Sequence, residues 1–186
     1  MPDKNQLRQT LLEQRQALLS EQIHIASQRI QHRLVSQDFW GRAENVGLYF
    51  PMKNEVDTSF LLQQGLESGK SIYYPRVEQG LVFSEINSLT DLVRGAFGLM
   101  EPQHTCPILK ANENLDLILV PGIGFDTQGF RIGYGKGFYD RYLSHKKNFA
   151  VGLAYEFQII SEIIPDPWDQ KVQFLITEKQ TYAFPS

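Results

Sequence analysis

The stretch LDLILVPGIGFDTQGFRIGYGKGFYDRYL, residues 115–143, combines a short apolar run with a loop rich in glycine. Pro121 and Gly122 end the apolar run, and a run of this length between turn residues is typical of a buried strand. Five glycines follow, at positions 124, 129, 133, 135 and 137. Residues 138–143 then predict the beginning of a helix, so we expect a strand, a glycine-rich loop and a helix in succession.

This order of elements is typical of a phosphate-binding site. Glycine lets backbone N–H groups approach a ligand closely, and a helix N-terminus offers unpaired N–H groups with a partial positive charge. Arg131 adds a planar fork for phosphate oxygens, and Lys136 adds a mobile positive charge. Asp140 would repel a phosphate unless a hard cation such as Mg²⁺ lies between them. The residues therefore favour an anion site with a metal ion, and a flexible surface loop is the alternative.

Two widespread nucleotide-binding motifs do not fit this loop. A P-loop requires G-x-x-x-x-G-K-[ST], but Phe130 stands at its first glycine position and Gly137 follows Lys136. A dinucleotide fingerprint requires G-x-G-x-x-G, whereas the glycines here are spaced G-x-G-x-G. The loop therefore supports neither motif.

Residues 121–143, PGIGFDTQGFRIGYGKGFYDRYL, strongly resemble the signature of the 5-formyltetrahydrofolate cyclo-ligase family, also called methenyltetrahydrofolate synthetase. The resemblance covers nearly the whole chain. It implies an ATP-dependent enzyme that converts 5-formyltetrahydrofolate to 5,10-methenyltetrahydrofolate and releases ADP and phosphate. It also implies ATP as cosubstrate, Mg²⁺ as the metal ion, and folate and ATP as small-molecule partners.

The resemblance also implies roles for individual residues. The expected ATP-binding set is Lys4, Arg8, Arg131, Gly133, Tyr134, Gly135, Lys136, Gly137, Phe138 and Tyr139. Within it, the residues expected to be catalytic are Arg131, Lys136 and Tyr139. The expected folate-binding set is Phe50, Met52, Glu55, Tyr134, Gly135, Lys136, Gly137 and Phe138. The expected Mg²⁺ ligands are Asp140 and Asp169, the latter in the family's C-terminal D-x-x-V element.

Some of these roles have alternatives in the sequence alone. Lys4 and Arg8 share a helix face, and their pattern by itself favours a solvated basic face over a phosphate contact. Glu55 follows a predicted strand, where ligands of open α/β sheets gather, and a carboxylate can accept two hydrogen bonds from a pterin edge. An exposed loop acid is the alternative for Glu55, and a turn acid is the alternative for Asp169.

Composition and charge limit the classes of protein to which this chain can belong. With 186 residues, 42% hydrophobic and 21% charged, we expect one globular domain spanning residues 1–186. A net charge of −3 predicts no general attraction to nucleic acid or to a membrane. Cys106 is the only cysteine, which excludes an intrachain disulfide, and the N-terminus is too polar for a signal peptide. The expected location is the cytoplasm, and the expected state is a monomer.

Hydrophobic periodicity and turn residues predict the other elements. Helices are expected at 3–19, with Arg15 off the apolar face, at about 21–38, with Ser20 as N-cap, and at about 58–68. Strands are expected at 45–50, 71–75, 81–86, 149–154 and 172–177, the second and third of them antiparallel, and residues 87–114 predict an irregular connection. Together they predict an α/β fold, a three-layer α/β/α sandwich of Rossmann-like type whose mostly parallel sheet has an antiparallel edge pair.

Other functions remain open at this level. A nucleotide- or folate-binding module without turnover would keep Glu55 and the glycine-rich loop, and would bind its ligands without releasing phosphate. An ATP-using enzyme of the same fold could act on another substrate and form no methenyl product. A phosphosugar isomerase on a related fold is a more distant alternative, which should ignore ATP.

Overall fold

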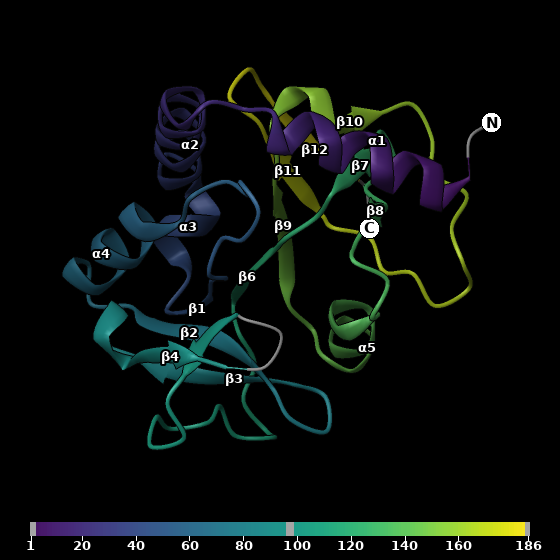
Figure 1. Ribbon diagram of the computed structural model, residues 1–186. Coiled ribbons are helices and arrows are strands. Elements are labelled where there is room, and N and C mark those ends of the chain that lie inside the picture. Colours follow the sequence, from purple (N-terminus) through teal and green to yellow (C-terminus); the bar gives the residue numbers. More distant parts are fainter. Residues whose placement is uncertain (1–2, 96–98, 185–186) are drawn as a thin grey trace.

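The computed structural model describes residues 3–95 and 99–184, so the predicted domain at 1–186 is described except for its ends and residues 96–98. Seven strands form the main sheet: β1 (Asn45–Gly47), β2 (Ser71–Val77), β3 (Leu81–Ile86), β6 (Leu117–Val120), β9 (Phe149–Leu153), β11 (Phe174–Ile176) and β12 (Thr181–Ala183). Their spatial order is β12-β11-β9-β6-β1-β2-β3 (Figure 1).

The main sheet is parallel in its interior and antiparallel at its edges. The strands β11, β9, β6, β1 and β2 are parallel to one another, whereas β3 pairs antiparallel with β2 and β12 pairs antiparallel with β11. The predicted antiparallel pair at 71–75 and 81–86 is therefore confirmed. The second edge pair is not predicted, because β12 is a three-residue strand of mostly exposed residues with little hydrophobic pattern.

Helices cover both faces of this sheet, as a three-layer sandwich requires. They are α1 (Lys4–Gln16), α2 (Ser20–Val35), α3 (Asp38–Arg42), α4 (Ser59–Glu67) and α5 (Phe138–His145). α2, α3 and α4 lie on one face and α5 on the other (Figure 1). Leu117 and Leu119 of β6 belong to the core beneath α2 and α4. Ile118 and Val120 belong to the core beneath α5, because successive side chains of a strand point to opposite faces.

α1 covers neither face and instead crosses the carboxyl ends of the parallel strands (Figure 1). It packs on a small sheet of β7 (Gly124–Asp126), β8 (Arg131–Ile132) and β10 (Ile159–Ile160), in the order β10-β7-β8. Leu11 of α1 lies in a separate apolar cluster with Ile123, Ile132 and Ile163. The N-terminal helix is thus held directly above the edge at which ligands bind in open α/β sheets.

The glycine-rich stretch is not one continuous loop, which corrects the predicted strand, loop and helix. Its first half forms the hairpin of β7 and β8, and only residues 133–137 remain as the loop before α5. We call residues 133–137 the Gly loop. The hairpin escapes prediction because β7 and β8 are three and two residues long, too short to show a period.

Other predicted boundaries are wrong in detail. The first helix ends at Gln16, and Leu19 rather than Ser20 is the N-cap of α2, with its N–H bonded to the Gln22 side chain. The helix predicted at 21–38 is interrupted by Ser36 and Gln37 and continues as α3. Residues 87–114 contain regular structure: a 3-10 turn, η1 (Leu89–Asp91), and the antiparallel pair β4 (Leu92–Arg94) and β5 (Met100–Pro102). A second 3-10 turn, η3 (Glu156–Gln158), precedes β10.

Asp126 holds the hairpin in place through three backbone N–H groups. It is fully buried, and its carboxylate accepts hydrogen bonds from the N–H groups of Gln128 and Phe130 at 2.9 Å and of Ile163 at 3.0 Å. Because a buried N–H group without a partner is costly, this carboxylate ties the turn of the hairpin to the segment that follows β10.

Asp126→Ala is expected to lower the free energy of unfolding by about 2 kcal/mol or more, because it leaves the buried N–H of Ile163 and the part-buried N–H groups of Gln128 and Phe130 without their acceptor. Urea unfolding followed by circular dichroism measures this change. Glu162→Ala, on the same segment but exposed, is the control and should change stability by less than about 0.5 kcal/mol. Equal effects of the two substitutions would contradict the anchoring role of Asp126.

Candidate active site

The Gly loop enters α5 through two glycines in the left-handed region. Gly135 has a φ of 85° and Gly137 a φ of 63°, conformations that glycine adopts without steric cost. Gly137 is the N-cap of α5 and brings no capping side chain, so the first turn of α5 presents its N–H groups beside the exposed Lys136. This arrangement can bind an anion, as the sequence predicts.

α1 carries the two cations that are predicted to bind phosphate, Lys4 and Arg8. The Nε of Arg8 donates to the carbonyl of Gly133 over 2.8 Å. The Nζ of Lys4 lies 2.6 Å from carboxylate oxygens of both Asp166 and Asp169. Arg8 therefore contacts the Gly loop, whereas Lys4 pairs with two carboxylates of the segment that follows β10.

The buried Arg131 and the partly buried Asp140 form an ion pair across the Gly loop, with 3.0 Å between Nη2 and Oδ1. Arg131 also donates to the carbonyl of Gln170 over 3.0 Å, and the N–H of Gln170 donates to Asp140 over 3.1 Å. Asp140 in α5 therefore contacts Gln170, the residue that directly follows Asp169, which is the other carboxylate predicted to bind metal.

Asp140 and Asp169 are compatible with Mg²⁺ but do not form a complete metal site. Within residues 3–95 and 99–184, no group of three or more His, Cys, Asp or Glu side chains is arranged to hold a metal ion. Mg²⁺ prefers hard oxygens and is usually bound by one or two carboxylates together with phosphate oxygens and water. The donor set fits that pattern, and each carboxylate contacts a protein cation in this structure, Lys4 or Arg131.

Glu55 is not an exposed loop acid, because only 5% of it is accessible to solvent. Its carboxylate accepts hydrogen bonds from the N–H of Met52 at 3.1 Å and from the hydroxyl of Tyr134 at 3.3 Å. Tyr134 belongs to the Gly loop, so the structure brings the expected folate residue Glu55 to the expected ATP loop. Burial raises the pKa of the Glu55 carboxyl from its usual 4.5 to about 7, and the nearby Arg15 is the strongest influence in the opposite direction.

Arg15 is a site residue that the sequence does not reveal. The helical pattern places it off the apolar face of α1, yet it is 1% exposed. Its Nη2 lies 3.7 Å from Glu55 and donates to the hydroxyl of Tyr134 over 2.5 Å. Its one sequence signal is the spacing from Arg8, since residues seven positions apart share a helix face.

The remaining predicted residues border these contacts. Tyr139 packs its ring 5.9 Å from the guanidinium carbon of Arg131, and its buried hydroxyl has no hydrogen-bond partner among the described residues. Phe138 begins α5 and is partly buried. Phe50 is 36% exposed and lies, with Met52, in the loop that carries Glu55.

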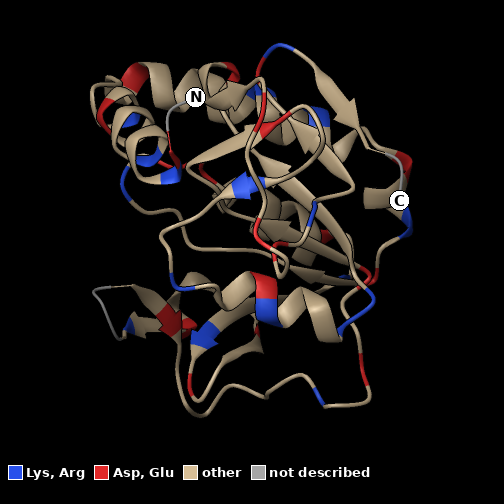
Figure 2. Cartoon of the chain, turned by 90° about the vertical axis from the view of Figure 1, so that its right-hand side faces the viewer, with Lys and Arg blue, Asp and Glu red and all other residues tan. Residues whose placement is uncertain are grey.

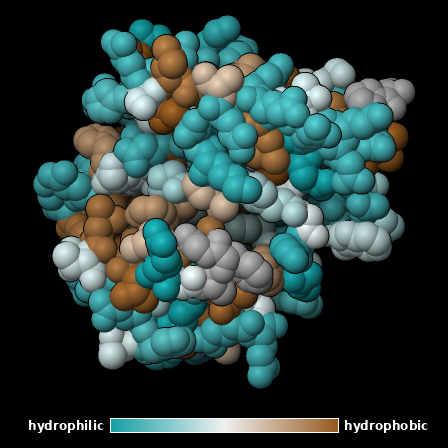
Figure 3. Space-filling model, in the orientation of Figure 1, coloured by the Kyte–Doolittle hydropathy of each residue, from teal (hydrophilic) through white to brown (hydrophobic). Residues whose placement is uncertain are grey.

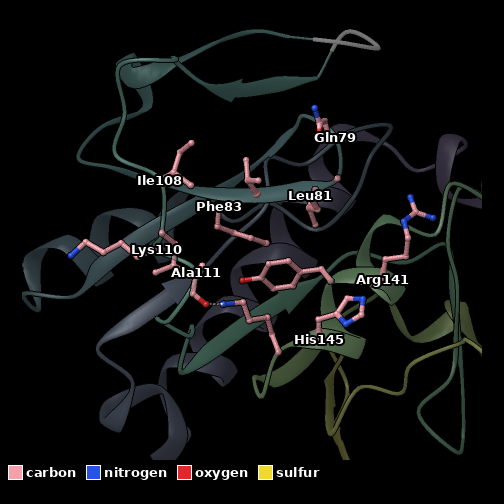
Figure 4. A pocket seen from close by; sticks show the side chains of 13 residues that line it. Gln79, Leu81, Phe83, Ile108, Lys110, Ala111, Arg141 and His145 are labelled. Atoms are coloured by element: carbon pink, nitrogen blue, oxygen red, sulfur yellow. Dashed lines mark hydrogen bonds between the residues drawn. The ribbon is translucent and has the colours of Figure 1, made fainter.

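The candidate site does not coincide with the groove shown in Figure 4. That groove has a volume of about 640 Å³ and lies between β3, residues 108–111 and α5 (Figure 4). It is lined by apolar side chains such as Leu81 and Phe83 and by Arg141 and His145, and includes none of the predicted site residues. On the face shown in Figure 3, hydrophobic residues gather mainly in the lower left half, and hydrophilic residues cover most of the upper half.

Comparison with known proteins agrees with this α/β fold. The model of the 5-formyltetrahydrofolate cyclo-ligase family matches residues 1–178. A 5-formyltetrahydrofolate cyclo-ligase of Haemophilus influenzae is 31% identical over 174 residues, which cover 89% of this chain and 92% of that protein. The chain therefore belongs to the 5-formyltetrahydrofolate cyclo-ligase family, as its sequence signature predicts.

Solved structures agree with this assignment. The NMR structure of Aquifex aeolicus 5,10-methenyltetrahydrofolate synthetase matches with a TM-score of 0.88 and 35% identity, covering 98% of this chain and 93% of that one. A 5,10-methenyltetrahydrofolate synthetase from Mycoplasma pneumoniae matches with a TM-score of 0.78 and 28% identity, covering 95% and 99%. The predicted fold class is confirmed over nearly the full length.

The raised pKa of Glu55 makes stability depend on pH. The folded protein holds this proton up to about pH 7, whereas the unfolded chain releases it near 4.5, so the contribution of this group to stability falls as the pH rises between these values. The stability of the wild type relative to Glu55→Gln should therefore fall by about 3 kcal/mol between pH 4 and 8. Urea unfolding at several pH values measures this difference.

Glu162→Gln, the same substitution at an exposed position, is the control for the substitution itself and should change stability by less than about 0.5 kcal/mol. A stability difference between the wild type and Glu55→Gln that stays constant from pH 4 to 8 would show that burial does not raise the pKa of Glu55.

Proposed function

We propose that this chain, as one domain spanning residues 1–186, converts 5-formyltetrahydrofolate to 5,10-methenyltetrahydrofolate with ATP and releases ADP and phosphate. Membership of the family supports the reaction. Two hydrogen bonds to neighbouring residues of the Gly loop support the arrangement of the substrates. Gly133 accepts a hydrogen bond from Arg8, and its neighbour Tyr134 donates one to Glu55. Two adjacent residues thus join the nucleotide-facing cations of α1 to the expected folate carboxylate.

In this reaction ATP activates a poor leaving group. The formyl oxygen attacks the γ-phosphorus, the bond to ADP breaks, and an imidate phosphate forms. N10 of the folate then attacks the formyl carbon and loses its proton, and the C–O bond breaks to release phosphate. Such a transfer requires positioning and charge neutralisation rather than a protein nucleophile.

The proposed nucleotide site lies at the Gly loop and the first turn of α5. Backbone N–H groups at Gly135–Phe138 and the cations Arg131 and Lys136 would neutralise the transferred phosphoryl group. Lys4 and Arg8 would hold the other phosphates, and Tyr139 supports Arg131 through its ring. Mg²⁺ held by Asp140 and Asp169 would supply further positive charge to the phosphate oxygens.

The proposed folate site lies at Glu55, whose carboxylate accepts a hydrogen bond from Tyr134 of the Gly loop. The Glu55 carboxylate keeps unused acceptor positions beyond the N–H of Met52 and the hydroxyl of Tyr134, so it can bind the N–H groups of a pterin edge. Phe50 and Met52 would contact the ring system. Residues 134–138, from the Gly loop into the start of α5, would border both substrates.

We also propose that the protein acts as a cytoplasmic monomer on small molecules and not on nucleic acid or membranes. Basic and acidic positions are interspersed on the side shown in Figure 2, which disfavours a polyanion as partner. Each helix in the described part of the chain is too short or too polar to span a lipid bilayer.

The primary test is the absorbance of 5,10-methenyltetrahydrofolate formed from 5-formyltetrahydrofolate, ATP and Mg²⁺. Product should require ATP, and Asp140→Asn should lower kcat by about 10²–10³-fold, because the variant loses a carboxylate that would hold the Mg²⁺ needed to neutralise the transferred phosphoryl group. Asp38→Asn, the same substitution at an exposed aspartate of α3, is the control. A folded protein that binds ATP but forms no product would indicate another substrate or a binding module.

The division of the site predicts opposite effects of two substitutions. Glu55→Ala should weaken binding of 5-formyltetrahydrofolate about tenfold or more with little effect on ATP, and Lys136→Ala should do the reverse. Isothermal titration calorimetry with each ligand separately measures both affinities. Equal losses of both ligands in both variants would show that the proposed subsites are not distinct.

A further inference from the structure

Arg15 joins α1 to three segments that meet at the carboxyl edge of the main sheet. Its Nε donates to the carbonyl of Lys53 over 3.0 Å, in the loop that carries Glu55. Its Nη1 donates to the carbonyl of Gly122 over 3.1 Å, just after β6. Its Nη2 donates to the hydroxyl of Tyr134 in the Gly loop. A guanidinium is the one side chain that can bind three such acceptors in a fixed plane.

The loop that carries Glu55 has an unusual backbone conformation. Arg15 contacts this loop through both its side chain and its backbone carbonyl. Lys53 and Asn54 have φ values of 48° and 61°, and left-handed conformations are uncommon for residues other than glycine. The side-chain amide of Asn54 donates to the backbone carbonyls of Arg15 at 3.2 Å and of Gln16 at 3.4 Å. Such conformations persist only where the surroundings hold them, and here the Arg15 side chain and the end of α1 do so.

The hydroxyl of Tyr134 bridges the guanidinium of Arg15 and the carboxylate of Glu55. Its hydroxyl accepts a hydrogen bond from Arg15 and donates one to Glu55, whereas the direct distance from Arg15 to Glu55 is 3.7 Å. The orientation of the first aromatic residue of the Gly loop is therefore set by the same guanidinium that stands behind the Glu55 loop.

We propose that Arg15 is a positioning residue that holds the Glu55 loop and the Gly loop in one arrangement and so couples the folate and ATP subsites. The inference rests on the proposed role of Glu55. Arg15 lies behind both ligand-binding segments, and being almost fully buried it acts through Tyr134 and Glu55 rather than by touching a substrate.

Arg15 also sets the charge that Glu55 carries near neutral pH. The charged or titratable groups that face Glu55 are Arg15 on α1, Lys53 on its own loop, Tyr134 on the Gly loop, Tyr49 after β1, Tyr139 on α5 and Tyr155 after β9. Among these, only Arg15 and Lys53 bring positive charge, and Lys53 is exposed. Loss of the Arg15 charge would therefore move the protonation of Glu55 to still higher pH.

The test compares Arg15→Gln, Arg15→Lys and the control Arg29→Gln, which makes the same change at an exposed arginine of α2. Steady-state turnover from pH 6 to 9 gives kcat and KM for each substrate. Calorimetry gives the affinity for 5-formyltetrahydrofolate with and without the β,γ-methylene analogue of ATP. Circular dichroism and thermal unfolding establish that each variant is folded.

Arg15→Gln should raise KM for 5-formyltetrahydrofolate about tenfold or more, with a smaller change for ATP, because the Glu55 loop loses its support. The acid limb of kcat/KM for the folate should move to higher pH. The effect of the ATP analogue on folate affinity should shrink toward none. Arg15→Lys keeps the charge but not the fork, so it should restore the pH profile while KM stays raised.

If Arg15→Gln does not fold, Arg15→Lys and Tyr134→Phe carry the test, because the second removes only the hydroxyl between Arg15 and Glu55. Tyr134→Phe should reduce the coupling between the two ligands. Folded variants whose KM values, pH profile and coupling match those of Arg29→Gln would overturn the proposal. Unchanged folate affinity in Glu55→Gln would instead overturn the proposed role of Glu55, and the absence of wild-type turnover would overturn the proposed reaction.

Discussion

The ion pair between Arg131 and Asp140 is the contact on which the geometry of the candidate site depends. It joins β8 to the first turn of α5 across the Gly loop, with 3.0 Å between the charged groups. Gln170 contacts both partners through its backbone, so a hairpin, a helix and a C-terminal segment share one network. Because Arg131 is buried, removing its partner would leave an unpaired charge, which typically costs about 3–5 kcal/mol. The Gly loop is therefore fixed at both ends, although its glycines permit movement between them.

Charge neutralisation at this site has a consequence for ligand binding. Asp140 contacts Arg131, and Asp169 contacts Lys4, so the acids that would hold Mg²⁺ neutralise cations that would hold phosphates. A nucleotide and its metal ion bring charges of both signs, and their binding would exchange contacts within the protein for contacts to the ligand. The ion pairs lost within the protein and those gained with the ligand are of the same kind. The net affinity for the nucleotide therefore depends on how well the protein groups are positioned to contact it. The network around Arg131 joins the two ends of the Gly loop, and Arg15 contacts Tyr134 near its start.

The sequence predicts the long, strongly patterned elements well. The apolar run at β6 and the helix at α5 follow from local pattern, and the pairing of β2 with β3 follows from the turn at Gln79 and Gly80. The hairpin of β7 and β8 and the edge strand β12 escape because a strand of two or three residues shows no period. Arg15 escapes for another reason. A cation off the apolar face of a helix is normally solvated, and nothing local shows that carbonyl groups from two distant loops surround this one.

The sequence by itself determined the family, the fold class and the identity of the glycine-rich segment, because these depend on residue types at fixed spacing. The tertiary structure alone decided which groups meet. Lys4 lies 165 positions from Asp169, and Tyr134 lies 79 positions from Glu55, yet each pair is in contact. It also decided that Glu55 is buried with a raised pKa instead of exposed. The first contact arises because α1 crosses the carboxyl edge of the sheet, and the second because two loops meet there. Burial and charge pairing between distant segments leave no periodic trace in a single sequence.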